Sequence, residues 1–348
     1  MQQTKSYFRR LAEGHENGLL SKIITPVLDV AAGFYGNAVQ AKRSEFEKGD
    51  KAKKFSFPVV SVGNLTWGGT GKTPFVEYLA KRISDRIKTP LILTRGYSHD
   101  EVEQFKHHLP KAVIGVGKER FEVGQKIANE QKIDIGILDD GFQHWNIQRD
   151  LDIVMVNALN PFGNEKLIPR GILREPLSAL KKAHIIIISH SNLITPKELQ
   201  MLRRKLHELA PQTHLVDAYL EPLFFYRAIK RVRVTLDRLE KHKVTTFSGV
   251  GAPRSFQLML SRMRIKPVRN FEFTDHHEFS KQELTEIKNI SQSASAEEVI
   301  TTEKDFYRNP DLITETLNPL ILATRLRISA GEEFLMEKLY RLLGITHG

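Results

Sequence analysis

The sequence predicts an α/β protein, in which a mostly parallel sheet carries a phosphate-binding loop (P-loop) and a second, smaller α/β domain follows. Three observations support this prediction. Short β-branched runs alternate with segments long enough to cross over a sheet. A glycine-rich turn follows the first of these runs. The chain has 348 residues, which is enough for about two domains.

The composition excludes several classes of protein. A hydrophobic fraction of 41% with 27% charged residues is typical of a folded chain and excludes disorder, collagen and coiled coils. Cysteine is absent, which excludes disulfides, thiolate metal sites and thiol redox chemistry. The formal net charge of +11 predicts an anionic partner, namely nucleic acid, a phosphorylated substrate or an acidic membrane surface. No run alternates aromatic residues with Arg or Lys, which argues against nucleic acid.

The apolar segment at 19–39 has three interpretations. As a helix it would be about 30 Å long, nominally enough to span a bilayer. Lys22, Pro26 and Asp29 lie inside it, however, and argue against both a spanning helix and a secretory signal. Two alternatives remain open on the residues alone, a helix that lies in a membrane interface between flanking cations and a helix packed on the core of its own domain.

Six apolar runs predict the strands of the first sheet, and they lie at 58–62, 90–94, 112–116, 135–138, 151–156 and 184–189. Continuous apolar runs of this length are typical of parallel strands covered by helices on both faces. Ligands of such sheets bind at the carboxyl ends of the strands. We assign this core domain to residues 51–215.

The pattern changes after residue 215, where the buried-strand character is lost. Residues 216–242 are interpreted as a polar connector, with a two-stranded hairpin as its expected form. The smaller domain is predicted over 243–348. Its expected strands lie at 243–249, 268–273, 298–302 and 320–325, and its expected helices cover 253–263, the segment after Ser280, and the end of the chain to Leu343. Ser280 and Glu283 form a capping box.

The turn after the first predicted strand reads GNLTWGGTGKTP, residues 63–74. Its glycines allow close approach of a phosphate, Lys72 reaches the terminal phosphates, and the Thr73 hydroxyl ligates a bridging Mg²⁺. Thr66 stands where the usual pattern has its first glycine. The alternative is a glycine-rich turn whose lysine points to solvent, but the strand before and the helix after favour a nucleotide site. The predicted nucleotide-binding residues are Thr66, Trp67, Gly68, Gly69, Thr70, Gly71, Lys72 and Thr73.

A second signal follows the strand that ends at Leu138, where the chain reads DDGFQHWN. A carboxylate at the tip of a strand beside a P-loop is where such proteins hold magnesium. Asp139 and Asp140 are therefore predicted metal ligands together with Thr73. The alternative is an ordinary Asp-Asp-Gly turn.

Seven blocks of the sequence resemble, in the same order, motifs of the tetraacyldisaccharide 4'-kinases of lipid A biosynthesis. They are GNLTWGGTGKTP at 63–74, RGY at 95–97, LDDGFQHW at 138–145, IPRGILREPLSAL at 168–180, GVGAPRSF at 249–256, DHHEF at 275–279 and TTEKD at 301–305. The P-loop of this family also has Ser or Thr in place of the first glycine, as Thr66 does here. The resemblance covers most of the chain from about Leu19 onward.

The resemblance implies transfer of the γ-phosphoryl group of ATP to the 4'-hydroxyl of a tetraacylated glucosamine disaccharide 1-phosphate, which yields lipid IVA. It implies a RecA-like P-loop domain joined by a hairpin to the smaller domain, with Mg²⁺ at the site. It also implies that residues 1–50 form a membrane-interface helix region on the cytoplasmic face of the inner membrane. We expect a peripheral, monomeric protein that binds no nucleic acid. The net charge suits this picture, because the membrane, ATP and the sugar phosphate are all anionic.

The resemblance also assigns roles to residues. Asp100 matches the catalytic base, and His276 in DHHEF matches its partner. Lys72 and Arg174 are expected to neutralise the γ-phosphate, and the expected substrate contacts are Asn64, Glu101 and Arg174. The chain departs from the family at one point, because only Ser98 and His99 separate RGY from Asp100, where relatives have a longer loop.

Each of these assignments has a structural alternative. Asp100 and Glu101 are alternatively part of a solvated charge cluster. Arg174 is alternatively a surface arginine at a strand edge. His276 and His277 are alternatively a surface pair or zinc ligands, although no third ligand stands at metal spacing. For residues 302–305 of the TTEKD block, a capped helix start is sufficient and no chemical role follows from the residues.

Two other functions remain to be separated from the lipid kinase. One is a membrane-recruited P-loop ATPase or GTPase that uses hydrolysis as a switch, with the second domain as a partner-binding module. The sequence shows no Asn/Thr-Lys-x-Asp guanine motif after its later strands. The other is a soluble kinase of a small metabolite.

Overall fold

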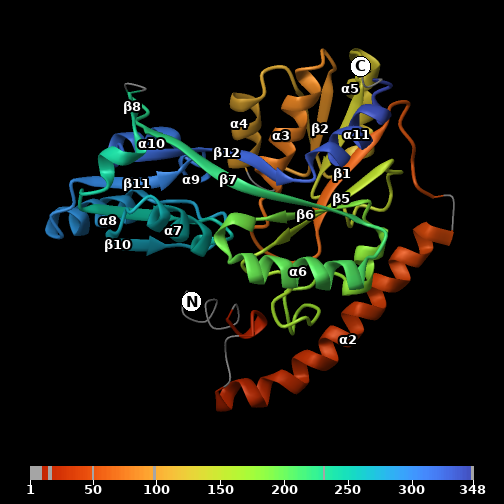
Figure 1. Cartoon of the computed structure of the whole chain (residues 1–348), viewed down its shortest axis with the longest axis horizontal. Helices are drawn as coiled ribbons and strands as arrows, with labels where there is room; N and C mark the ends of the chain where they lie inside the picture. The colour runs from red at the N-terminus through yellow and green to blue at the C-terminus, as the bar shows by residue number, and fades with distance from the viewer. Residues whose placement is uncertain (1–9, 15–17, 49–50, 97–98, 230–231, 346–348) are drawn as a thin grey trace.

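The structure is a computed structural model that describes residues 10–14, 18–48, 51–96, 99–229 and 232–345 (Figure 1). Its strands are β1 (Val59–Asn64), β2 (Pro90–Thr94), β3 (Val113–Val116), β4 (Ile135–Asp139), β5 (Leu151–Asn157), β6 (Ile185–Ser189), β7 (His214–Tyr226), β8 (Arg233–Val234), β9 (Val244–Ser248), β10 (Pro267–Glu272), β11 (Glu298–Thr302) and β12 (Leu320–Ala330). They form one continuous sheet in the order β10-β9-β11-β12-β7-β6-β5-β1-β4-β2-β3, and β8 pairs with β7 outside this path.

The helices connect and cover these strands. They are α2 (Leu19–Lys48), α3 (Lys72–Ser84), α4 (His99–His108), α5 (Arg120–Glu130), α6 (Pro196–Leu209), α7 (Pro253–Arg262), α8 (Lys281–Ser293), α9 (Glu303–Phe306), α10 (Pro310–Thr316) and α11 (Glu332–Leu342). The described residues also form three short 3-10 helices, η1 (Leu177–Lys182), η2 (Ser191–Leu193) and η3 (Leu236–Leu239). We call β1 to β6 with their helices the large lobe, and β9 to β11 with α7 to α10 the small lobe.

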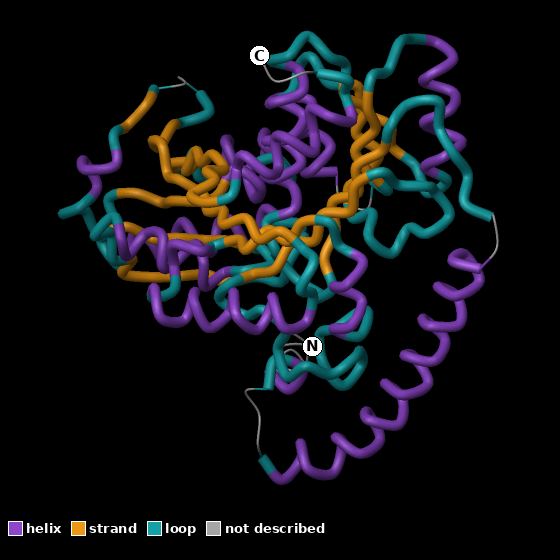
Figure 2. Tube along the Cα trace, turned by 45° about the vertical axis from the view of Figure 1, so that its right-hand side comes forward, coloured by secondary structure: helices purple, strands orange, loops and turns teal. Residues whose placement is uncertain are grey.

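The large lobe is a parallel sheet with helices on both faces, as Figure 2 shows. All pairings among β1 to β6 are parallel, and each of the six predicted strands forms within two residues of its expected ends. Val60 and Ile92 belong to a core that includes α3, α4 and α11, whereas Leu91 belongs to a separate core beside α5. Neighbouring residues of one strand thus enter different cores, as alternation across a sheet requires. The predicted fold class is confirmed.

The small lobe repeats this plan on a smaller scale. β10, β9, β11 and the start of β12 are parallel neighbours. α7 contributes to one core and α8 to another, with the sheet between them. The predicted capping box begins α8, because the Ser280 hydroxyl accepts from the Glu283 backbone N–H and the Glu283 side chain accepts from the Ser280 N–H. The last helix, α11, lies in the predicted 243–348 segment but packs in the large-lobe core with α3.

The long strands β7 and β12 join the two lobes. The first residues of β7 pair in parallel with β6, and the rest of β7 pairs antiparallel with β12, from Ala218 opposite Ile328 to Tyr226 opposite Ile321. Because this pairing is antiparallel, the strands of the small lobe run toward the large lobe and those of the large lobe run toward the small lobe. The carboxyl ends of both half-sheets therefore face each other. β7 also forms a short hairpin with β8 within the predicted 216–242 connector.

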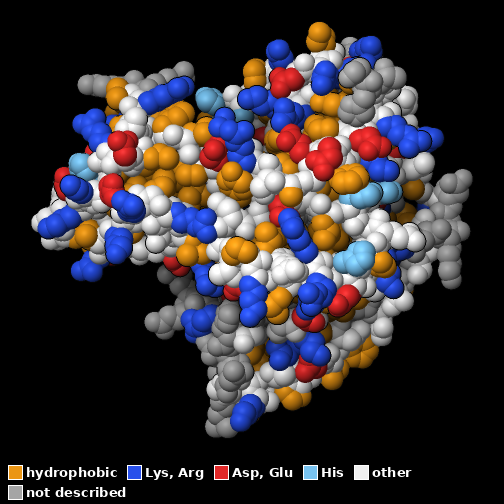
Figure 3. Space-filling model, in the orientation of Figure 1, with side chains coloured by type: hydrophobic (Ala, Val, Ile, Leu, Met, Phe, Trp, Pro, Cys, Tyr) orange, Lys and Arg blue, Asp and Glu red, His pale blue; other side chains and the backbone are white. Residues whose placement is uncertain are grey.

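The long helix α2 lies along the outside of the large lobe (Figure 1). Two interactions attach its inner side to the large lobe. The Tyr35 hydroxyl donates to the Arg174 carbonyl at 3.0 Å, and Arg43 forms an ion pair with Glu175. Its outer side is apolar and exposed, and Figure 3 shows these side chains along the lower right edge. No helix in the described part of the chain is both long and apolar enough to cross a bilayer.

Candidate active site

The glycine-rich loop leaves the large-lobe sheet where the strand order reverses. β1 lies between β4 and β5, so the loop after Asn64 occupies the position where open α/β sheets bind ligands. Gly68 and Gly71 have φ angles of 115° and 80°, a conformation that glycine adopts without strain. α3 begins at Lys72, directly after Gly71, so its N-terminus adds free backbone N–H groups at the same point. The loop therefore has the local geometry of a phosphate cradle.

Lys72 points into this loop rather than to solvent. Its side chain is 17% exposed, and its Nζ donates to Asn64 Oδ1 at 3.2 Å and lies 3.4 Å from Asp140 Oδ1. Asn64 is fully buried, and its Nδ2 donates to the Thr66 carbonyl at 2.8 Å and to the Thr70 hydroxyl at 3.1 Å. Asn64 thus stabilises the loop from inside through hydrogen bonds and orients the Lys72 side chain. The alternative of a solvent-pointing lysine does not describe this loop.

Asp140 and Arg174 form a second part of the site beside Lys72. The Arg174 guanidinium lies 3.0 and 2.9 Å from the two Asp140 carboxylate oxygens. Burial alone would raise the pKa of Asp140, but the charges of Lys72 and Arg174 outweigh it and hold this pKa well below its usual range. Asp140 is therefore ionised between two cations, and Arg174 is part of the site.

Asp139 lies deeper, at the end of β4 and next to Val62 of β1. It is buried, and the Thr94 hydroxyl donates to it at 3.2 Å. Burial, together with the negative charges of Glu101 and Asp140, raises the pKa of Asp139 to about 7. Such a concentration of carboxylates favours a bound cation. Asp139, Asp140 and Thr73 therefore fit the oxygen ligands that Mg²⁺ uses with phosphates, which need only one or two carboxylates from the protein.

Asp100 lies in the first turn of α4 and is the most buried of the predicted catalytic residues, with 2% of its side chain exposed. Its Oδ2 lies 3.0 Å from Arg308 Nε and 3.7 Å from His276 Nδ1. Burial acts to raise the pKa of Asp100, but the hydrogen bond with His276 and the charges of Lys304 and Arg308 lower it to about 2. Asp100 is therefore an ionised, buried carboxylate and not part of a solvated charge cluster.

The shortened loop before α4 does not separate Asp100 from the P-loop. The next residue, Glu101, accepts a hydrogen bond from the Thr73 hydroxyl at 3.0 Å. Tyr97 of the RGY block and Ser98 lie outside the described residues. Asp100 and Glu101 together connect α4 to both the P-loop and the small lobe.

The small lobe contributes its own loops to this region. Gly251 follows β9 and packs on Gly69 so closely that an added Cβ would lie 2.7 Å from the Gly69 Cα. An added Cβ at Gly69 would in turn lie 2.8 Å from the Ala252 nitrogen. β9 lies between β10 and β11, so this loop occupies the switch point of the small-lobe sheet. The loops that follow β1 and β9 at these reversals of strand order, which we call the switch-point loops, therefore meet backbone to backbone.

The two histidines of DHHEF have different surroundings. His276 has a φ of 58°, lies near Asp100, and its Nε2 is 3.7 Å from Asp275 Oδ2. His277 stacks on Phe273 and its Nε2 lies 3.0 Å from Glu283 Oε1. Among the described residues no group of three or more His, Asp or Glu side chains is arranged to hold a metal ion. Only the first of the two histidines faces the reaction region.

The remaining predicted residues divide by exposure. Thr66, Thr70 and Thr73 are buried in the loop. Trp67 is 73% exposed, although its backbone N–H donates to the Ile172 carbonyl at 2.7 Å. Trp67 therefore presents its indole ring to solvent at the edge of the loop.

Sequence reasoning missed the cations of the small lobe. Lys304 lies 3.3 Å from both Glu101 Oε1 and Asp275 Oδ1, and Arg308 pairs with Asp100. Lys304 belongs to the TTEKD block, which the sequence analysis recognised as one of the seven family motifs but to which it assigned no chemical role. Arg308 lies outside the quoted motifs, three residues after Asp305, and no sequence pattern indicated a role for it.

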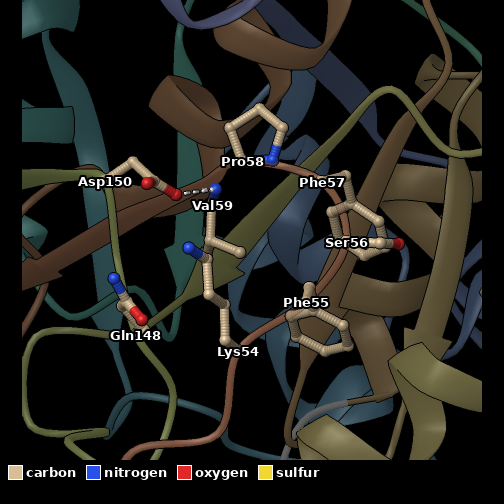
Figure 4. Close-up of a pocket in the computed structure, with 8 residues that line it drawn as sticks. All are labelled: Lys54, Phe55, Ser56, Phe57, Pro58, Val59, Gln148 and Asp150. Carbon is tan, nitrogen blue, oxygen red and sulfur yellow. Dashed lines mark hydrogen bonds between the residues drawn. The ribbon is translucent and has the colours of Figure 1, made fainter.

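A separate hollow of about 240 Å³ lies away from this region (Figure 4). It is bounded by residues 54–59, Gln148 and Asp150, and Asp150 accepts from the Val59 N–H at 2.7 Å. Val59 begins β1 whereas the P-loop follows the end of β1. The hollow is therefore at the opposite edge of the sheet, and we do not assign it to the active site.

A lysine-bearing phosphate loop beside an ionised carboxylate is the arrangement that phosphoryl transfer to an acceptor group needs, so the chain is a kinase of the P-loop class. Comparison with known proteins identifies the family. The family model described as "Tetraacyldisaccharide-1-P 4'-kinase" matches residues 24–343, and the chain belongs to this family. The resemblance drawn from the seven motifs is confirmed.

Individual relatives agree with this assignment. A protein of Arabidopsis thaliana named "Probable tetraacyldisaccharide 4'-kinase, mitochondrial" is 34% identical over 89% of this chain and 88% of its own length. The tetraacyldisaccharide 4'-kinase of Halothermothrix orenii is 32% identical over 86% of this chain and 87% of its own. The crystal structure titled "apo" form LpxK from Aquifex aeolicus in complex with ATP superposes with a TM-score of 0.69 at 25% identity, and the match covers 93% of this chain and all of that one.

The contact between the two switch-point loops generates a prediction. Gly251→Ala places a methyl group against Gly69, so we expect the loops to separate and the free energy of unfolding to fall by about 1–3 kcal/mol. Urea denaturation measures this change. Gly33→Ala is the matched control, because Gly33 lies in α2 with nothing within 4 Å of the added Cβ. Equal stabilities of the Gly251→Ala variant and the wild type would contradict the observed contact.

Proposed function

We propose that the chain transfers the γ-phosphoryl group of ATP to the 4'-hydroxyl of tetraacyldisaccharide 1-phosphate, at the site where the P-loop meets the small lobe. One observation carries the proposal. The Thr73 hydroxyl of the P-loop donates a hydrogen bond to Glu101, and the neighbouring Asp100 is buried beside His276 of the small lobe. A base and a phosphate-binding loop thus share one polar cluster. The names of the relatives supply the identity of the nucleotide and the acceptor.

In this proposal the phosphates of ATP lie in the loop from Thr66 to Thr73. Lys72 and Arg174 neutralise the γ-phosphate, and both are already paired with Asp140. Thr73, Asp139 and Asp140 would hold Mg²⁺, which would supply positive charge against the ATP phosphates.

The reaction forms a bond between the sugar 4'-oxygen and the γ-phosphorus and breaks the bond from that phosphorus to the β-phosphate oxygen. ADP leaves, and the hydroxyl proton passes to Asp100. A carboxylate with a pKa of about 2 is a weak base. A weak base is sufficient because the transition state of phosphoryl transfer is loose, and catalysis depends mainly on positioning and charge neutralisation. The low pKa ensures that Asp100 is ionised at every working pH.

His276 supports the proton transfer from the side of the small lobe. Its two ring nitrogens lie 3.7 Å from Asp100 and from Asp275. The imidazole thus lies between two carboxylates, a position from which it can orient the Asp100 carboxylate. Asn64 and Glu101 remain proposed substrate contacts, although both are engaged in the P-loop network.

We further propose that α2 places this site at a membrane surface, on the cytoplasmic face of the inner membrane. Four exposed apolar side chains follow the helical spacing of one face, namely Ile23, Val27, Val30 and Phe34, with exposures of 67%, 69%, 62% and 74%. A helix bound to its protein on one side and apolar on the other is suited to lie in a bilayer interface. The same interface would hold the acyl chains of the substrate. We expect the protein to act as a monomer.

The alternative of a P-loop hydrolase switch makes a different prediction for the fate of the phosphate. With γ-labelled ATP and the disaccharide 1-phosphate, we expect label in the lipid and little free phosphate. Lys72→Ala and Asp100→Ala should each lower kcat by at least about 100-fold, because each removes a main electrostatic or acid–base contribution. Phosphate release without labelled lipid would support the switch, and near-normal turnover of Asp100→Ala would remove Asp100 as the base.

His276→Ala distinguishes a role in the chemical step from a role in binding. Because His276 contacts Asp100 rather than the P-loop, we expect kcat to fall more than the KM for ATP rises. Steady-state kinetics with varied ATP measure both constants. An effect confined to KM would make His276 a binding residue.

The membrane role of α2 is tested by replacing Ile23, Val27, Val30 and Phe34 together with Ser. Loss of these side chains removes most of the apolar surface available for insertion, so we expect binding to vesicles that contain anionic lipid to weaken at least about tenfold. Co-sedimentation with the vesicles measures binding.

The matched control replaces four exposed apolar residues on other elements, Ile87, Val116, Met201 and Val268. This variant should bind vesicles as the wild type does. If both variants bind equally well, α2 is not the membrane-binding element.

A further inference from the structure

The TTEKD block has a structural role that is easily seen. The Thr302 hydroxyl caps α9 by accepting from the Asp305 N–H at 3.1 Å, and it donates to the Asp305 carboxylate at 2.7 Å. A capped helix start therefore explains Thr302. It does not explain why Lys304 and Arg308, on the same short segment, both turn toward acidic residues of the active site.

Arg308 is surrounded by partners from four different segments. Its Nε donates to Asp100 Oδ2 at 3.0 Å, and its Nη2 donates to the Gly249 carbonyl at 2.7 Å. Its Nη1 donates to the His277 carbonyl at 3.0 Å and lies 2.9 Å from Asp305 Oδ1. The side chain is 4% exposed, so these partners take the place of water. A single guanidinium thus joins α4 of the large lobe to three segments of the small lobe.

Each of these partners is next to a reacting part of the site. Asp100 is the proposed base. The carbonyl of His277 directly follows His276, the proposed partner of that base. Gly249 begins the loop that packs on Gly69 of the P-loop, and its N–H also donates to Asp305 at 2.9 Å. The position of Arg308 therefore fixes the base, the imidazole and the small-lobe loop relative to one another.

We propose that Arg308 is a positioning residue for phosphoryl transfer, which orients the Asp100 carboxylate and holds the Gly249 and His277 segments of the small lobe against the large lobe. This inference rests on the proposed function. The hydrogen bonds and ion pairs of Arg308 include no residue of the P-loop, so Arg308 acts through Asp100. Lys304 has a supporting role, because it bridges Glu101 of the large lobe and Asp275 of the small lobe.

The chemistry of the side chain explains why an arginine occupies this position. A guanidinium has five N–H donors in a rigid, planar arrangement, whereas an ammonium is a point charge with three donors on a flexible stem. Lysine at position 308 would keep the charge but could not reach Asp100, Gly249 and His277 together. Arg308→Lys therefore separates the loss of geometry from the loss of charge.

The charge of Arg308 predicts an effect on the pH profile. The charged and titratable groups around Asp100 are Arg308, Lys304 and His276, with Glu101 and Asp275 beside them. Arg308 and Lys304 lower the pKa of Asp100, so removal of one cation raises it. In the wild type this pKa of about 2 lies below the working range, so Asp100 is ionised throughout it. Loss of the cation raises the pKa toward the working range, so we expect kcat of the variant to fall at acid pH where the wild type keeps its activity.

The experiment compares two substitutions in the full-length chain with γ-labelled ATP and the lipid acceptor. We expect Arg308→Lys to lower kcat about tenfold, by the same factor at neutral and acid pH, because charge is kept and geometry is lost. We expect Arg308→Gln to lower kcat at least about 100-fold at neutral pH and to lose further activity at acid pH, where the wild type keeps its activity. The KM for ATP should change less than about threefold in both, because Arg308 does not touch the P-loop.

Arg227→Lys is the matched control for the loss of a multiply bonded arginine. The Arg227 guanidinium lies 2.7 and 2.6 Å from the Glu298 oxygens and donates to the Asn318 carbonyl at 2.6 Å. Glu298 begins β11 and Asn318 precedes β12, so both lie at the amino ends of the small-lobe strands, opposite the active site. We expect this variant to lose stability but to keep the kcat and pH profile of the wild type.

The outcomes separate the positioning role from the proposed function. An active wild type together with an Arg308→Gln variant whose kcat is normal at both neutral and acid pH overturns the positioning role. Equal losses of kcat in Arg227→Lys and Arg308→Lys also overturn it, because the effect would then be one of general stability. A wild-type chain that transfers no label to the lipid contradicts the proposed function itself.

Discussion

The antiparallel pairing of β7 with β12 is the constraint on which the site depends. Each half of the sheet is parallel, so each collects its ligand-binding loops at one edge. If the two halves continued in the same direction, these edges would point the same way and would not meet. The reversal at β7 and β12 turns them toward each other, and the loops after β1 and β9 come into backbone contact at Gly69 and Gly251. The fold thus creates one site from two sheets.

The polar cluster between the lobes must be complete to be stable. A buried ion pair gains little over an apolar contact, but removal of one partner leaves an uncompensated charge and costs about 3–5 kcal/mol. Asp100 is balanced by Arg308 and His276, Glu101 by Lys304, and Asp140 by Lys72 and Arg174. Asp139 is the exception, because burial and its acidic neighbours raise its pKa to about 7. A bound cation would remove this imbalance, which supports the Mg²⁺ ligands proposed above.

The sequence predicted the parts of this site that depend on local order. The P-loop, the strand ends and the Ser280 capping box follow from glycine spacing, apolar runs and capping residues, and all of them form. The sequence could not predict contacts between distant segments, such as Arg308 with Asp100, because no local pattern relates residues 208 positions apart. It also placed α11 with the small domain, since only the three-dimensional structure shows that Leu335 and Leu339 pack beside α3.

A double-mutant cycle between Asp100 and Arg308 tests the shared site most directly. Asp100→Asn, Arg308→Lys and the combined variant are compared with the wild type by kcat for lipid phosphorylation. If Arg308 acts through Asp100, its substitution should cost little once the carboxylate has been removed, and the double variant should turn over within about threefold of Asp100→Asn alone. Losses that multiply fully in the double variant would mean that the two residues act independently, and would contradict a reaction centre held together across the lobes by this pair.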